Sequence, residues 1–326
     1  MDYVGFSIYN RHLMGDKAML QDFNIHGDEP EDVFPKILGD LKKMVDGLKC
    51  SISLGYCIHL CNLTDLFQHK FIKDPWLQAI KTTDFQRPFI TGLHINFPHS
   101  ALPLAPDFKN TFKLAMETCT MLDVDAIVLH APLIETAQTD IDFANLMMSD
   151  DIITAMEKND TILCWENAQD TIARYRLLEH LLHWRELLVE RLESAGHEEM
   201  VDRHQFCFDT GHLLVSIFRD EANKEDQVAY LREFAKHIKV FHIQCNDGFS
   251  DQHLIPYLPA EFHPKSKNVD ADAFLKNSDL ILDLLNICNS GDKLDGRHIH
   301  LEVDSPMPPK QMDIFFKRYY DMFNPV

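Results

Sequence analysis

The sequence lacks the features that mark several protein classes. It has no apolar run long enough to cross a membrane, and residues 1–5 carry no basic segment of the kind that opens a signal peptide. Lys and Arg are few, 31 against 51 Asp and Glu, so the net charge is −20. Such a charge repels nucleic acid and anionic lipid, although bound cations reverse it locally. We therefore expect a cytoplasmic protein without a membrane partner, and nucleic acid is a disfavoured partner.

The cysteines also lack a common pattern. None of the eight belongs to a CxxC pair, and most lie inside apolar segments. Buried free thiols in a reducing compartment are the expected state of such residues. Cys57 and Cys61 are four residues apart, but without a second pair this spacing does not predict a metal site.

Apolar strand-like segments alternate with amphipathic helix-like segments along the chain. The strand-like segments are residues 3–8, 51–60, 88–95, 125–130, 161–166, 204–209, 238–243 and 297–303. Helices are expected at 31–48, from Pro106 onward, and at 141–158, 174–193, 227–237, 270–288 and 308–323. Eight alternating units without a composition break predict an α/β fold, a (β/α)₈ TIM barrel. We expect a single domain over 1–326, with inserted loops at 62–87 and 244–268.

Ligand-type side chains end six of the predicted strands, which is where a barrel of this kind builds its active site. These residues are His94, His130, Glu166, Asp209, His242 and Glu302. Three more follow strands six and seven: His212, Asp251 and His253. Each has a structural alternative, such as a helix cap or a turn residue. Carboxylates at the ends of buried strands need partners, however, and metal ions are the simplest partners that satisfy them all.

The residue types indicate which metal to expect. Imidazole combined with carboxylate favours zinc, manganese or iron over magnesium or calcium. Nine ligands are too many for one ion, so the pattern predicts a site with more than one divalent ion.

One stretch, residues 205–213, leaves two interpretations open. A short apolar strand ends at Asp209, turns through Thr210 and Gly211, and presents His212. Asp209 and His212 are then two ligands directed into one cavity. Alternatively, Asp209 opens a turn that caps the next helix.

Taken in order, these motifs resemble the xylose isomerase-like TIM barrels, and among them endonuclease IV and its relatives. The matching segments are Gly92-Leu93-His94, Val128 to Pro132, Trp165 to Ala168, Phe208 to His212, Phe241-His242 through Asn246-Asp247, Asp251-Gln252-His253 and His300-Leu301-Glu302. The resemblance covers roughly residues 88–303. It implies up to three ions, with zinc foremost and manganese or iron as alternatives.

The resemblance also implies how nine ligands are shared among three ions. A first ion is held by His94, His130 and Glu166. Glu166 bridges to a second ion, whose other ligands are Asp209, His242 and Glu302. The third ion is held by His212, Asp251 and His253.

Several departures from the family count against DNA recognition. The glycine-rich stretch after the Asp-x-His element is absent, and the chain continues Leu254-Ile255-Pro256-Tyr257. The aromatic residue that repair enzymes use to probe a duplex is Phe97 here. Residues 131–142 contain no Lys or Arg, whereas phosphate tracking needs such cations. A small phosphorylated or sugar-like substrate is therefore expected.

Two functions follow as hypotheses. The first is hydrolysis of a phosphoester, in which a hydroxide bridging the ions near Glu166 attacks phosphorus. The alternative is a one-metal sugar or polyol isomerase, epimerase or dehydratase, with Glu166 and Glu302 as catalytic acid and base. The two differ at His212, which is an ion ligand in the first and is free to contact substrate in the second.

Overall fold

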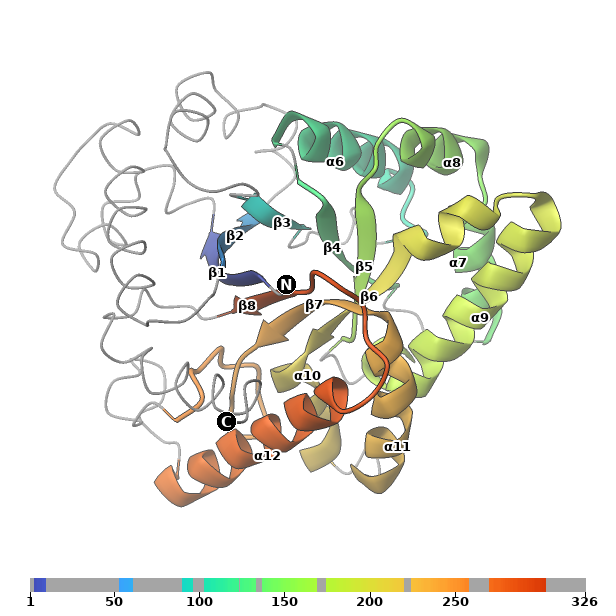
Figure 1. Ribbon diagram of the computed structural model, residues 1–326. Coiled ribbons are helices and arrows are strands. Elements are labelled where there is room, and N and C mark those ends of the chain that lie inside the picture. Colours follow the sequence, from blue (N-terminus) through green and yellow to red (C-terminus); the bar gives the residue numbers. More distant parts are fainter. Residues whose placement is uncertain are drawn as a thin grey trace, which may run out of the picture.

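A closed barrel of eight parallel strands forms the centre of the computed structural model (Figure 1). The structure describes residues 103–122, 124–132, 137–168, 174–219, 224–257 and 270–302, together with the backbone of 3–9, 53–60 and 90–95. The strands follow the chain order around the barrel: β1 Tyr3–Tyr9, β2 Ser53–Leu60, β3 Ile90–Ile95, β4 Ala126–His130, β5 Ile162–Glu166, β6 His204–Asp209, β7 Ile238–Ile243 and β8 His298–Leu301. The predicted TIM barrel is confirmed.

Helices cover the outside of the barrel from β4 round to β8 (Figure 1). They are α6 Phe108–Leu122, α7 Ala137–Met147, α8 Asp150–Glu157, α9 Leu178–Ala195, α10 Thr210–Phe218, α11 Lys224–Phe234 and α12 Ala271–Asn289. None of them is long and apolar enough to cross a bilayer. The helices expected at 31–48 and 308–323 lie outside the described residues.

The single helix expected over 141–158 is wrong, because the chain forms two helices there. Ser149 adopts an extended conformation, with φ −71° and ψ 144°, and its hydroxyl donates to the carbonyl oxygen of Leu146. Asp150 and Asp151 then occupy the first turn of α8, where negative charge is favoured by the helix dipole. A serine followed by two acids is a helix-start signal, and here it overrides the continuous apolar periodicity.

From β4 to β7 the barrel interior is lined by small side chains. One buried cluster contains Ala126, Val128, Cys164, Cys207 and Val240. Side chains alternate between the two faces of a strand, so the residue two positions further on points into the same interior. Those residues are His130, Glu166, Asp209 and His242. The strand period therefore directs these four predicted ligands inward, one layer above the small side chains of this cluster. All five described cysteines are buried and free, as expected.

Large aromatic residues fill the layer between barrel and helices. Phe143 of α7 stacks on Trp184 of α9, with ring centroids 4.3 Å apart, and contacts Trp165 of β5 edge-on at 4.9 Å. Trp165 is fully buried and its indole N–H donates to Nδ1 of His204, at 3.3 Å. His204 therefore belongs to the outer core and not to the barrel mouth.

His204 is expected to make the fold sensitive to acid. Burial, and next the charge of Arg185, lowers the pKa of His204 to about 3, against 6.5 ordinarily. The unfolded chain takes up this proton first, so stability is lost as pH falls from about 6.5 towards 3, at about 1.4 kcal/mol per unit. Urea unfolding of the wild-type protein and a His204→Phe variant, each at pH 6 and pH 4, measures this slope. We expect the wild-type free energy of unfolding to fall by roughly 3 kcal/mol more than that of the variant. Equal losses of unfolding free energy in the two proteins would show that His204 is not the cause of the acid sensitivity.

Candidate metal centre

Four predicted ligands meet at the carboxyl end of the barrel. Glu166 and Asp209 end β5 and β6, His242 is the last residue but one of β7, and Glu302 follows β8 directly. One ligand-type atom from each lies within 4.8 Å of the others, and all four side chains are buried. His242 Nδ1 lies 2.7 Å from Glu166 Oε1 and 2.9 Å from Glu302 Oε2. We call this set the tetrad. Its donor types and its spacing fit one divalent ion of the zinc or manganese kind.

Three further predicted ligands form a second set beside the tetrad, the outer group: His212, Asp251 and His253. Asp251 Oδ2 lies 2.7 Å from His253 Nε2 and 3.6 Å from His212 Nε2. The outer group adjoins the tetrad, since His253 Nδ1 lies 3.9 Å from Glu302 Oε1. Asp251 Oδ1 is buried and makes no hydrogen bond with the described residues, so it can serve a bound cation.

His130 contacts the tetrad through Glu166. Its Nε2 lies 2.9 Å from Glu166 Oε2, and the backbone register pairs the two residues across β4 and β5. The two oxygens of Glu166 thus face different histidines, His130 and His242. His94 lies in β3, where its Cα pairs with that of Val128. Its side chain lies outside the described residues, so its role as a ligand stays a prediction.

Strand β6 passes into α10 without an intervening loop. Asp209 Oδ1 accepts a hydrogen bond from the backbone N–H of His212 at 2.7 Å, which makes Asp209 the N-cap of this helix. Thr210 and Gly211 are therefore the first helical residues and not a separate turn. The two interpretations of this stretch turn out to be compatible, because Asp209 caps the helix and also belongs to the tetrad.

Four carboxyl groups lie close together in the tetrad and the outer group: Glu166, Asp209, Asp251 and Glu302. Burial, and then Glu302, Glu166 and Asp251 against the opposing charge of His212, raises the pKa of Asp209 to about 8. Burial alone would lower the pKa of His242, but the neighbouring carboxylates and Cys207 raise it well above its usual value. Buried carboxylates in such a group call for compensating cations, which is the condition that bound metal ions meet.

Sequence reasoning missed two residues that support the ligands. Asn167 donates from Nδ2 to the carbonyl oxygen of Asp209 at 3.0 Å and accepts from the backbone N–H of Asp209 at 2.8 Å. Gln244 donates to both carboxylate oxygens of Asp209, at 3.3 and 3.1 Å. The adjacency of Asn167 to Glu166 was a usable signal, whereas nothing local marks Gln244.

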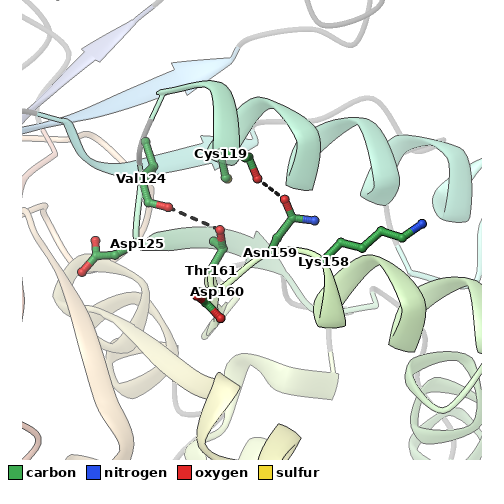
Figure 2. Close-up of a pocket in the computed structure, with 8 residues that line it drawn as sticks. Cys119, Val124, Asp125, Lys158, Asn159, Asp160 and Thr161 are labelled. Atoms are coloured by element: carbon green, nitrogen blue, oxygen red, sulfur yellow. Dashed lines mark hydrogen bonds between the residues drawn. The ribbon is translucent and has the colours of Figure 1, made fainter.

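A hollow lies at the end of the barrel opposite the tetrad. It has a volume of about 320 Å³ and is lined by residues that precede β4 and β5, among them Asp125 and Thr161 (Figure 2). The side chains of Asp125 and Lys158 point to opposite sides of it in Figure 2. This hollow therefore presents no convergent set of charged groups and contains none of the predicted ligands.

Solved structures resemble the chain, whereas no family model and no curated protein matches it. A D-tagatose 3-epimerase-like protein is 16% identical, with a TM-score of 0.55 over 99% of this chain and 98% of that one. AsfvAP, in the AsfvAP:AG structure, is 12% identical, with a TM-score of 0.60 over 99% of both chains. The IOLI protein with a bound zinc atom is 14% identical, with a TM-score of 0.51 over 98% of both.

Proposed function

Since the chain has the fold of the xylose isomerase-like TIM barrels, we propose that it is a metal-dependent phosphoesterase with a multinuclear site. The observation that carries this proposal is the outer group, in which Asp251 lies between His212 and His253 beside the tetrad. Sugar isomerases or epimerases and endonuclease IV-like enzymes share this fold, so the fold does not choose between them. The number of metal ligands is the feature that distinguishes the two functions.

The tetrad alone would serve a one-metal isomerase, with Glu166 and Glu302 as acid and base. That alternative leaves His212 free to contact substrate, and its hydrogen bonds favour a different role. His212 Nδ1 lies 2.7 Å from the carbonyl oxygen of Asn167, an acceptor, so Nδ1 carries the proton. An ion held against Asp251 would take the lone pair of the other nitrogen, Nε2, which lies 3.6 Å from Asp251 Oδ2. A histidine whose second nitrogen donates to a backbone carbonyl is the usual arrangement of a metal ligand.

The remaining ligands support a shared site. Each oxygen of Glu166 faces a separate histidine, which is the arrangement expected of a carboxylate placed between two ions. We propose zinc, with manganese or iron as alternatives, and His94 as a further ligand next to His130. Ions bound there would supply an activated water as the nucleophile and neutralise charge on phosphate oxygens. The role of the protein is to hold the ligand side chains in fixed positions and to keep the imidazoles in the ligating tautomer.

The proposed substrate is a small phosphorylated molecule. The chain has a net charge of −20, and residues 131–142, which follow β4, contain acids but no Lys or Arg. A duplex would need many cationic contacts along its phosphates, whereas one phosphate group can be bound by the ions themselves.

Metal content tests the proposal directly. We expect purified, metal-loaded protein to contain close to three zinc ions per chain by plasma mass spectrometry, and to hydrolyse bis(p-nitrophenyl) phosphate. A single weakly held ion, with ketose epimerisation and no phosphoester hydrolysis, would instead support the isomerase alternative.

A further inference from the structure

Gln244 is the described residue whose side chain joins the tetrad to the outer group. It lies just beyond β7 and is fully buried. Its Nε2 donates to Asp209 Oδ1 and Oδ2, at 3.3 and 3.1 Å, and its Oε1 accepts from the backbone N–H of His253 at 3.2 Å. One amide therefore contacts a ligand of each set, and both its donor and its acceptor ends are used.

The backbone of Gln244 is held as firmly as its side chain. Its N–H donates to Thr210 Oγ1 at 3.1 Å, and the same hydroxyl donates to the carbonyl oxygen of Gln244 at 2.7 Å. Thr210 is the first residue of α10, directly after Asp209. Main-chain and side-chain contacts thus tie the end of β7 to the start of α10.

The backbone conformation of His253 indicates what the contact with Gln244 does. His253 has a φ of 50°, in the left-handed region that residues other than glycine seldom adopt. Such a conformation persists where surrounding contacts hold it, and it is found disproportionately at functional sites. The hydrogen bond from its N–H to Gln244 Oε1 is one of the contacts that hold it.

The absence of a side chain at Gly211 leaves room for the side chain of Gln244. A Cβ on Gly211 would lie 2.5 Å from Gln244 Cδ and 2.6 Å from its Oε1. Gly211 is inside α10 and has no left-handed φ, so its own backbone does not require glycine. The requirement comes from the buried amide, which cannot move aside without losing its contacts to Asp209 and His253.

We propose that Gln244 is a positioning residue that couples the two ligand sets, so that ordering Asp209 around one ion also orders His253 for the next. This inference rests on the proposed multinuclear site. Loss of a residue that hydrogen-bonds to a metal ligand typically lowers metal affinity about 10- to 100-fold, and this magnitude is expected for Gln244.

Three variants test the coupling. Gln244→Met keeps the side-chain volume and removes the three side-chain hydrogen bonds to Asp209 and His253, while Gly211→Ala keeps the glutamine and displaces it. Gln227→Met is the matched control, because Gln227 is an equally buried amide that bridges α9 and α11 through Leu178 N and Glu179 Oε2. Metal-free proteins are titrated with zinc against a competing chelator, and their cobalt forms are compared by visible absorption. Thermal melts establish that each variant is folded.

Both site variants are expected to bind at least one zinc ion about 10- to 100-fold more weakly than wild type, with altered cobalt bands. Gln227→Met is expected to match wild type in both. A folded Gln244→Met or Gly211→Ala protein with wild-type affinities and an unchanged cobalt spectrum would overturn the inference. A wild-type chain that binds one ion contradicts the proposed multinuclear site and removes the second ion that the coupling needs. A wild-type chain that binds several ions, with unchanged affinities in the two site variants, overturns the coupling alone.

Discussion

Replacing Asp251 with alanine is expected to lower hydrolysis of bis(p-nitrophenyl) phosphate by at least about 100-fold. Asp251 lies between His212 and His253, so its removal takes away the carboxylate shared by the outer group. An ion at this position would stabilise transition-state charge by several kcal/mol, and each 1.4 kcal/mol corresponds to about a factor of ten in rate. Initial rates at saturating zinc, together with zinc content per chain, measure the effect. We expect the variant to lose about one ion and to keep the tetrad ion.

Ser250→Ala is the control for disturbance of the loop. Ser250 precedes Asp251 and is exposed, and its backbone N–H donates to Asp247 Oδ1 whatever its side chain. Its rate should match that of the wild-type protein. An Asp251→Ala protein that hydrolyses the ester at the wild-type rate would remove the outer group from the mechanism and leave the tetrad as the whole metal site.

Asp209→Asn is expected to stabilise the metal-free fold at alkaline pH while it weakens metal binding. The folded-state pKa of Asp209 is about 8, against 3.8 ordinarily, chiefly because of burial. The unfolded chain ionises first, so wild-type stability is intact below about pH 4 and is lost as pH rises towards 8. The accumulated loss is on the order of 5 kcal/mol. Asparagine does not titrate, and it caps a helix as well as aspartate does.

Urea unfolding of the two chelator-treated proteins, at pH 4.5 and pH 8, is the appropriate measurement. The variant should be more stable than wild type by several kcal/mol at pH 8, and the gap should narrow strongly at pH 4.5. Added zinc should restore the wild-type protein far more than the variant, because binding to the folded state alone stabilises it. A gap that is the same at both pH values would show that ionisation of Asp209 is not its cause.

The barrel and most of its site were readable from the sequence because both depend on local patterns. A buried parallel strand is a short, mainly apolar run, and in β4, β6 and β7 the apolar residues lead directly into His130, Asp209 and His242. The period of two then decides which side chains share a face. Eight strands with this period predict that these side chains meet at one end of the barrel, and the structure brings eight of the nine residues together there. Their role as metal ligands stays a prediction.

Features that depend on contacts between distant segments could not be read in the same way. The contacts of Gln244 with Asp209 and His253 arise only when β6, β7 and the following loop are packed together. Gly211 likewise resembles an ordinary turn glycine until the neighbouring amide is known. The break between α7 and α8 is different, because Ser149 and the acids after it carried a local signal that the apolar periodicity obscured.

The direct passage from β6 into α10 has a consequence for how this chain can change in length. Each residue added to a helix rotates everything beyond it by about 100°. One residue inserted between Asp209 and His212 would therefore turn the imidazole away from Asp251 and break the cap that Asp209 forms. One residue removed would have a similar effect in the opposite sense. Insertions and deletions between Asp209 and His212 would therefore disrupt the site, whereas the loops elsewhere can vary in length.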